Sequence, residues 1–539
     1  MRQRQTSLAA VGLSFLVLSG CTVVGPNFTT PDAPAAEDWL PNQVELDPDD
    51  SKVSSTSAAN AAWWRVFDDP VLDKLVALAY GQNLTLQTAG LRIYEARAQL
   101  GIAVGSQYPQ TQGIGAVYER RLISDQIGVI RDIDEVVDID RTFNVYQAGF
   151  DAAWELDFWG KFRRGIESAD ANLIAQIADY DDVLVSLTGD VASTYVQIRT
   201  IEERLAIAHA NVAIEEESLR ITKIRYRDGV TTELDVEEAT ALLNSTKASI
   251  PALQLALTQA KNALSVLLGM PPSDLRGILG EPGTIPKPPA EVAIGLPAEL
   301  LRRRPDIRGA ELQAAAQSAQ IGIAQADLYP AFTLAGSVGV EASDLSDLFT
   351  GGAFTGVFNP SITLPIFNYG RIKNNVRVQD ARLQELIVNY QNTVLNAYLE
   401  VENALVGFLQ TQQEADYLAA SVAASERAVK LALIQYKAGT ADYTRVLNTQ
   451  TAQLRGQDRL TSAKGQIATN LVALYKALGG GWQIRAGDDF IPEATKEVMA
   501  GRTDWGDLLK PAAIPEGDEA LNPPPSPEPF TLFKRRPDW

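Results

Sequence analysis

The same order of elements occurs twice along this chain, and this repeat limits the possible folds more than any other feature. Ala-Gln-Leu-Gly-Ile-Ala around Gly101 matches Ala-Gln-Ile-Gly-Ile-Ala around Gly322, an offset of 322 − 101 = 221, and a Tyr-Pro pair follows each. Further glycines correspond at an offset of 210: Gly160 with Gly370, Gly229 with Gly439, and Gly269 with Gly479. The first copy therefore carries 11 extra residues between Pro109 and Gly160, where we expect an exposed loop.

Each copy predicts a short helix, a β-hairpin, a very long helix, a glycine turn and a return helix. The predicted helices span 70–107, 161–227 and 233–268 in the first copy, and 305–328, 371–437 and 443–478 in the second. Apolar residues recur every seven positions along both long helices, which predicts coiled coils. These columns are Ile177, Leu184, Val191, Ile198, Leu205, Val212 and Leu219, then Ile387, Val394, Val401, Phe408, Ala415, Val422 and Val429. A helix over 161–227 rises about 100 Å, so the short helix and the return helix are expected to stack end to end beside it.

Alternating residues between the helices predict two β-hairpins, over 110–157 and 331–367. The first strand, from Gln110 to Tyr118, has the weakest pattern. Proline ends the helix at each Tyr-Pro pair, and apolar residues then alternate with small or polar ones. Such strands suit a membrane barrel, and they equally suit a soluble hairpin with one buried face. No apolar run of about 18 residues follows Cys21, so a membrane-spanning mature chain would need a closed barrel. Four strands are too few to enclose a channel, whereas three chains supply 3 × 4 = 12.

The N-terminus has the layout of a bacterial lipoprotein signal. Arg2 and Arg4 precede an apolar run that ends at Leu18-Ser19-Gly20-Cys21, which resembles a lipobox. We expect residues 1–20 to be removed and Cys21 to be lipidated. The alternative is a coincidental cysteine after an ordinary signal. Thr22 in place of an aspartate indicates release to the outer membrane.

Composition argues against several functions. The chain has 539 residues with one cysteine, one histidine (His209) and a net charge of −20. A zinc site needs about four ligands, and nucleic-acid binding needs a basic surface. The sequence contains no P-loop, nucleophile elbow or metalloprotease motif, so we expect no catalytic residue, metal or cofactor, and no nucleic-acid partner.

The predicted organisation has six parts. They are the signal peptide 1–20, a lipidated extended segment 21–62, the first copy 63–268, a Pro-rich crossover 269–304, the second copy 305–482, and a Pro-rich tail 483–539. We expect the tail to be extended or disordered, because it contains Pro523-Pro524-Pro525.

Several ordered fragments resemble the TolC-like outer-membrane factors, in the NodT-type branch that pairs with RND efflux pumps. They are Trp63-Trp64, Asp69-Pro70, the two Ala-Gln-Leu/Ile-Gly-Ile-Ala segments, 154–160, Leu301-Arg302-Arg303-Arg304-Pro305-Asp306, Leu364-Pro365-Ile366-Phe367 and both tip glycines. The resemblance implies an α+β membrane protein: a homotrimer with a 12-stranded barrel in outer-membrane lipid above a periplasmic helical barrel. It also implies a passive exit duct for drugs or toxic compounds. Its partners would be a periplasmic adaptor (membrane fusion) protein and an inner-membrane transporter of RND type.

The resemblance also implies contact and gate residues at the helix turns. Adaptor contacts are expected at Arg225, Tyr226, Asp228, Gly229, Tyr436, Ala438 and Gly439. Gate candidates are Glu237, Glu238, Tyr443, Arg445 and Asn448. Many relatives carry an inward aspartate where this chain has Asn448. An acidic ring after the first tip would favour cations, and the alternative is that these acids stabilise a helix N-terminus.

Three other classes of protein would explain some of these sequence features. A structural coiled-coil lipoprotein explains Cys21 and the heptads but not the paired hairpins. A periplasmic adaptor has helical hairpins but is not expected to carry two long copies. The exit duct of a type I protein secretion system shares the whole architecture, and the sequence barely separates it from a drug-efflux duct.

Overall fold

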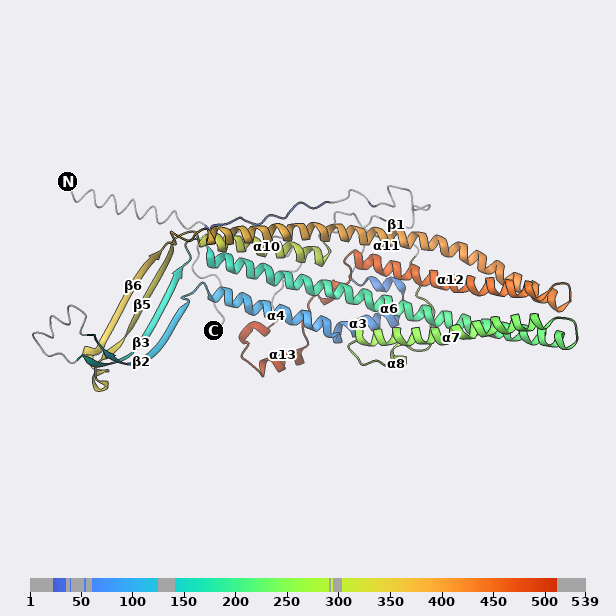
Figure 1. Cartoon of the computed structure of the whole chain (residues 1–539), viewed down its shortest axis with the longest axis horizontal. Helices are drawn as coiled ribbons and strands as arrows, with labels where there is room; N and C mark the ends of the chain where they lie inside the picture. Colours follow the sequence, from blue (N-terminus) through green and yellow to red (C-terminus); the bar gives the residue numbers. More distant parts are fainter. Residues whose placement is uncertain are drawn as a thin grey trace, which may run out of the picture.

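The computed structural model describes residues 23–34, 39, 53–54, 61–124, 141–289, 292–293 and 303–510. The molecule is long and narrow, with a four-stranded sheet at one end and two helical hairpin turns at the other (Figure 1). In the described part of the chain, no helix is both long enough and apolar enough to cross a membrane.

The two copies have matching elements. The first contains α3 (Pro70–Gln82), α4 (Leu84–Gly105), β2 (Thr111–Leu122), β3 (Thr142–Leu156), α6 (Lys161–Arg227) and α7 (Glu233–Leu267). The second contains α10 (Pro305–Ala326), β5 (Ala331–Ala342), β6 (Phe354–Thr363), α11 (Arg371–Lys437) and α12 (Tyr443–Ala477). The long helices α6 and α11 have 67 residues each, and the return helices α7 and α12 have 35 each. Short elements fill the connections: η1 (Trp63–Phe67), α8 (Arg276–Leu279), a two-residue pairing of β1 (Val53–Ser54) with β4 (Val292–Ala293), η2 (Leu345–Asp347) and η3 (Gly351–Ala353).

The predicted end-to-end stacking is confirmed, but the helix expected over 70–107 is interrupted. Asn83 separates α3 from α4, and its Oδ1 accepts a hydrogen bond from the backbone N–H of Leu86 at 2.9 Å. Its Nδ2 donates to the last carbonyl of α7, that of Leu267, at 2.9 Å. Asn83 therefore begins α4 and fastens it to the end of α7.

The heptad columns form the centre of the helical layer. Leu184, Val191 and Ile198 of α6 are fully buried, as are Val394, Val401 and Phe408 of α11. Ile177 and Ile387, at the ends nearest the sheet, are half-buried, whereas Leu219 and Val429, at the ends nearest the turns, are buried. Burial of apolar side chains at about 25 cal/mol per Å² makes this stripe the main force holding the helices together.

The sheet is antiparallel in the order β2-β3-β5-β6, so β2 and β6 are its two edges. One face is apolar, and a line of residues across it is Ile114, Phe150 and Val338. The opposite face is small or polar, as in the line Gly113, Asp151 and Ser337. The predicted alternation is therefore confirmed on β3 and β5. On the two edge strands it is interrupted, because Val117 of β2 and Val357 of β6 lie on the small, polar face.

Two strand boundaries differ from those predicted. β6 ends at Thr363, so the apolar residues Leu364 and Ile366 lie beyond the sheet, next to Pro365, which lacks the N–H a strand needs. β2 continues past Tyr118 to Leu122, because β3 is long enough to pair with it there. The connection between β2 and β3 is the site of the predicted exposed loop, but 125–140 lie outside the described residues.

The expectation of an extended or disordered tail is wrong for residues 483–510. This segment contains η4 (Trp482–Arg485), α13 (Glu493–Ala500) and η5 (Gly506–Leu509). The guanidinium of Arg485 forms an ion pair with the buried Asp181 of α6, and the hydroxyl of Tyr94 donates to Asp489 at 2.6 Å. These contacts bind the tail to α4 and α6, and residues 511–539 lie outside the described residues.

Candidate functional site

Both hairpin turns use a glycine that closes the end of a long helix. Gly229 has a φ of +71° and Gly439 a φ of +74°, a conformation that glycine adopts without strain. The residue after each glycine donates its N–H back to the helix, from Val230 to the carbonyl of Arg225 at 2.8 Å and from Thr440 to Gln435 at 3.0 Å. The two turns thus have the same geometry.

The predicted contact residues divide into an exposed set and a packed pair. Tyr226, Asp228, Gly229, Ala438 and Gly439 are exposed at the ends of the hairpins. By contrast, Tyr436 is buried, and the guanidinium carbon of the half-buried Arg225 lies 4.7 Å from the centre of its ring. Arg225 also donates to the carbonyl of Lys437 at 3.3 Å, so this pair joins one turn to the other.

Above the turns, α6 runs antiparallel to α12, and we call this contact the seam. Polar pairs cross the seam along its length: Asp190 with Lys476 at 3.1 Å, Arg204 with Asp458 at 2.7 Å, and Asn211 with Gln457 at 2.9 Å. An apolar cluster closes it near the turns, consisting of Leu219, Ile221, Ala239, Leu243, Ala432, Tyr436, Tyr443 and Val446. The seam is what holds the two hairpins of one chain against each other.

One predicted gate residue, Tyr443, lies inside the seam, and a second, Glu238 of α7, lies beside it. Tyr443 is 1% exposed, and its ring packs edge-on against Tyr436 with 5.5 Å between the ring centres. Burial raises the pKa of Tyr443 to about 12, and the nearby acids Glu215 and Glu238 act in the same direction. Glu238 is half-buried, with one carboxylate oxygen that has no hydrogen-bond partner.

The other three gate candidates remain on the surface of the single chain. Glu237, Arg445 and Asn448 are exposed, and the side chain of Arg445 donates to Gln435 at 3.4 Å. Within the described chain Arg445 forms no ion pair with a neighbouring acid. Asp235 accepts the backbone N–H of Thr232 at the start of α7, which favours the helix-terminus explanation for that acid.

Arg304 has a role that the sequence analysis did not assign. Its guanidinium pairs with Asp306 at 2.7 Å and with Glu400 of α11 at 2.7 Å, and it donates to the carbonyl of Ala477 at 2.8 Å. It thereby fastens the start of α10 to the end of α12. The sequence showed the Arg-Pro-Asp segment as part of the family resemblance. It could not show the partners of Arg304, because Glu400 and Ala477 are 96 and 173 positions away.

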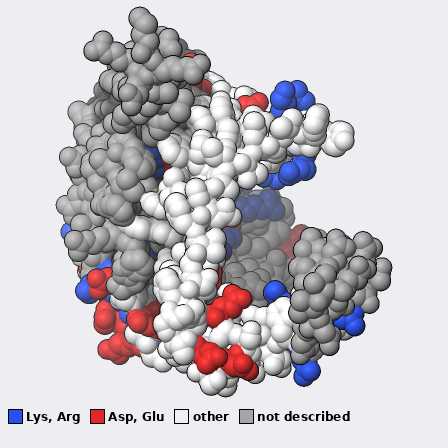
Figure 2. Space-filling view, turned by 90° about the vertical axis from the view of Figure 1, so that its left-hand side faces the viewer, with Lys and Arg blue, Asp and Glu red and all other residues white. Residues whose placement is uncertain are grey.

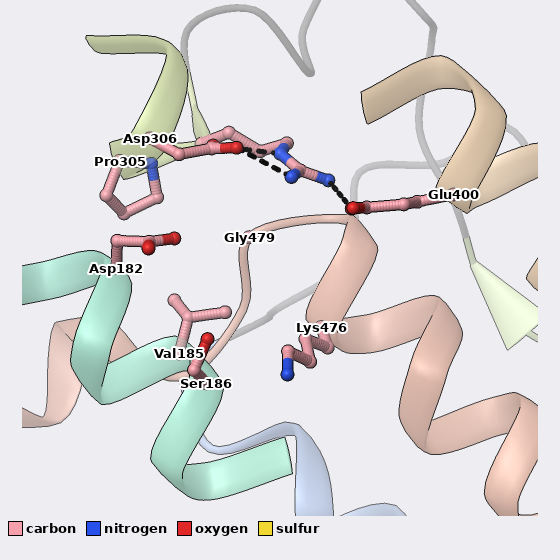
Figure 3. A pocket seen from close by; sticks show the side chains of 9 residues that line it. Asp182, Val185, Ser186, Pro305, Asp306, Glu400, Lys476 and Gly479 are labelled. Carbon is pink, nitrogen blue, oxygen red and sulfur yellow. Dashed lines mark hydrogen bonds and ion pairs between the residues drawn. The ribbon is translucent and has the colours of Figure 1, made fainter. Parts of the chain in front are cut away.

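Beside Arg304 lies a cavity of about 280 Å³ with charged walls (Figure 3). Asp182 of α6 and Lys476 of α12 face this space together with Asp306 and Glu400. Burial raises the pKa of Asp182 to about 6, and Asp306 adds to the effect. In the described part of the chain no group of three or more His, Cys, Asp or Glu side chains could hold a metal ion.

Cys21 lies outside the described residues, but the segment that follows it is firmly held. The side chain of Arg164, 1% exposed, donates to the carbonyls of Val24 and Gly25 at 3.2 Å each and to Asn27 at 2.9 Å. The N–H of Val24 donates to the carbonyl of Trp159 at 3.0 Å. The chain just after Cys21 is therefore fixed where the sheet meets the helices.

The sheet end of the molecule is hollowed on one side, with charged groups at its margins (Figure 2), among them Glu119, Arg120 and Arg121 at the far end of β2. β6 carries no charged residue and β5 carries only Glu341. On β2 and β6 the large apolar side chains are exposed, among them Ile114 at 90% and Phe358 at 74%. An exposed apolar sheet at one end and long antiparallel helices over the rest define the class: an elongated α+β protein with a long helical extension.

Comparison with known proteins identifies the family. The model of the outer membrane efflux protein family matches residues 75–270 and 296–480, one stretch for each copy of the repeat. The chain belongs to this family and is an outer-membrane component of efflux.

Three relatives illustrate the match. The pyoverdine export outer membrane protein OpmQ of Pseudomonas putida is 32% identical over 78% of this chain and 88% of its own length. Nodulation protein T of Rhizobium leguminosarum bv. trifolii is 31% identical over 87% of this chain and 96% of its own. The structure of the outer-membrane channel OprN superposes with a TM-score of 0.78 at 33% identity, covering 85% of this chain and 99% of that one.

Proposed function

We propose that three copies of this chain close into the exit duct of a tripartite efflux pump, through which small toxic molecules pass to the exterior. The observation that carries the proposal is that a single chain exposes both edges of its sheet and apolar residues on two sides of its helical layer. β2 and β6 are sheet edges, and an open edge offers a row of unpaired backbone groups to a neighbouring strand. Pairing β6 of one copy with β2 of the next gives a closed ring of 3 × 4 = 12 strands.

The helical layer also exposes large apolar side chains on two opposite sides. α11 exposes a stripe of large apolar residues at Val388, Leu395 and Leu399. α4 and α7 lie on the opposite side of the helical layer from α11 (Figure 1), and they expose Leu84, Leu91 and Leu255. Exposed apolar residues on both sides support a head-to-tail ring, in which one side of each copy covers the other side of the next.

In the assembled duct the apolar face of the sheet meets lipid and the small, polar face lines the passage. The lipid on Cys21 lies at the base of the barrel, since Arg164 and Trp159 hold the residues just after it there. No step requires a catalytic residue or cofactor.

The exposed turns are the contact surface for a periplasmic adaptor, which joins the duct to an inner-membrane transporter of RND type. The support is the exposure of Tyr226, Asp228, Gly229, Ala438 and Gly439, while Arg225 and Tyr436 hold the turns in place. Relatives described as exporting pyoverdine and as solvent and toluene efflux proteins make small molecules the working class of substrate. A duct for protein secretion has the same architecture and is the second candidate.

In-cell photo-crosslinking from Asp228 and from Ala438 tests this proposal, with a crosslinker at the exposed Arg502 of the tail as the control. Capture of an RND-pump adaptor from both turns, and not from Arg502, supports the efflux duct. Capture of an adaptor of an ATP-driven exporter moves the function to protein secretion. Self-crosslinks alone, under every condition of induction, would contradict the proposal.

A further inference from the structure

A buried carboxylate without a cation lies close to the turns, where α6 packs against α7 beside the seam. Glu215 of α6 is 3% exposed. The hydroxyl of Thr246 on α7 donates to its Oε1 at 3.0 Å, whereas its Oε2 has no hydrogen-bond partner. A carboxylate in this position either carries a proton or leaves a negative charge in a nearly dry contact.

Further unpaired polar atoms surround Glu215. Ser218 Oγ and both amide atoms of Gln450 are buried without partners, although Gln450 is only 4% exposed. Asn211 bonds to Gln457 across the seam, and one heptad further toward the turns the antiparallel register places Gln450 opposite Ser218. The unpaired atoms of α6 and α12 therefore face each other across the same part of the seam.

The charged groups around this point do not neutralise Glu215. On α7, Glu238 is an acid and Lys247 pairs with the exposed Glu216 at 2.7 Å. On α11 the groups are Tyr436 and Glu426, on α12 Tyr443, and on α6 Arg225, which lies over the Tyr436 ring. Within the described residues Glu215 has no ion pair. Burial accordingly raises the pKa of Glu215 to about 7, and the Thr246 hydroxyl lowers it slightly against that trend.

We propose that Glu215 is a proton-operated latch of the periplasmic end: protonated, it keeps α6 closed against α12, and ionised, it releases one hairpin from the other. The proton passes to water as the seam opens, and the carboxylate is then hydrated. The inference rests on the proposed function, since separation of the hairpins at the turns widens the duct there.

The direction of the pH effect follows from the two states of the seam. In the closed seam Glu215 has a raised pKa of about 7, whereas in a hydrated open seam it returns toward 4.5. The closed state is thus favoured most below pH 4.5. Its free energy relative to the open state rises as the pH increases to about 7, and above that pH the equilibrium no longer depends on Glu215. Over this interval the ratio of open to closed seams rises by up to roughly 300-fold, since the two pKa values differ by about 2.5.

A distance measurement between the two turns tests the latch without requiring transport. Spin labels are placed at Asp228→Cys and Ala438→Cys of the full-length lipidated protein, and distances are measured by pulsed electron resonance from pH 4.5 to pH 8. We expect the longer distances to gain population as the pH rises. Glu215→Gln should hold the short distance at every pH, while the exposed neighbour Glu216→Gln should behave as the wild type.

A second variant guards against a folding defect in Glu215→Gln. Thr246→Val removes a hydrogen bond that favours the ionised carboxylate, so the midpoint of the transition should move to higher pH. An unchanged pH profile in Glu215→Gln, or an unmoved midpoint in Thr246→Val, overturns the latch. Because the distances are read without an adaptor or a membrane gradient, failure of the efflux proposal would show separately in the crosslinking experiment.

Discussion

The two copies of the repeat have helices of equal length, yet different chemistry fastens each return helix to its short partner. In the first copy a neutral side chain, Asn83, links the end of α7 to the start of α4. In the second copy the charged Arg304 links the end of α12 to α10 and adds Glu400 of α11. We call these two contacts the neutral joint (Asn83, between α7 and α4) and the charged joint (Arg304, between α12 and α10). The helices meet end to end at both joints, but different side chains hold them.

The same divergence occurs near the turns. At the offset of 210, Glu215 corresponds to Ser425, since 425 − 215 = 210, and Thr246 corresponds to Gly456. At this pair of positions only the first copy therefore carries a buried carboxylate. This difference teaches that a repeat fixes lengths and packing, while single positions can place a buried carboxylate in one copy and a neutral residue in the other.

Among the substitutions that test this comparison, we expect the largest loss of stability at the charged joint. Arg304→Ala leaves Asp306 and Glu400 without their shared cation and the carbonyl of Ala477 without its donor. We expect a loss of about 3 kcal/mol in the free energy of unfolding, measured by guanidinium denaturation of the detergent-solubilised protein. Arg304→Lys should lose less, because it keeps the charge but not the forked geometry. Equal losses in the two variants would contradict the account.

The neutral joint should be weaker. Asn83→Ala removes the cap of α4 and the bond to Leu267, for an expected cost of about 1.5 kcal/mol in the same denaturation experiment. Asn83→Ser, which can still cap the helix, serves as the matched control and should recover part of the loss. A cost as large as that of Arg304→Ala would remove the distinction between the two joints.

The turns should behave alike, because their backbones are alike. Gly229→Ala and Gly439→Ala each place a side chain on a residue with positive φ, at an expected cost of about 1 kcal/mol. The check is the thermal midpoint followed by far-ultraviolet circular dichroism, at fixed pH and salt. A large difference between the two variants would show that one turn is not an independent copy of the other.

The smallest effect is expected from Asp182, beside the charged joint. Since its pKa is raised to about 6 in the folded chain, its contribution to stability is most favourable below its usual pKa of 3.8 and declines as the pH rises to about 6. Asp182→Asn should flatten this decline by about 1 kcal/mol or less, since the group is partly exposed. Denaturation midpoints at pH 4 and pH 7 provide the test. An unchanged difference between the two pH values would assign the decline to other groups.

The lengths of the long helices could be predicted because the signals are local. Gly160 and Gly229 bound α6, and an unbroken heptad column runs between them. The break at Asn83 was missed because apolar residues continue on both sides of it, although asparagine before a helical run is a known cap signal.

Features that depend on distant partners could not be predicted. The order in the tail comes from Arg485 with Asp181, which are 304 positions apart, and proline-rich residues further on suggested disorder. Glu215 begins the run Glu215-Glu216-Glu217, which reads as a solvated face of a helix. Only the packing of α7 and α12 against α6 shows that the first of the three is buried.

The central claim, that three copies close edge to edge, is tested most directly by disulfide crosslinking between the two edge strands. A cysteine at Val117 of β2 is combined in turn with one at Thr355, Val357 or Asn359 of β6, which lie on the same face of the sheet. Cys21 is expected to be blocked by its lipid. The account predicts that at least one pair yields a ladder on denaturing gels that ends at three chains. Ladders that continue past three, or crosslinks confined to single chains with every pair, would contradict it.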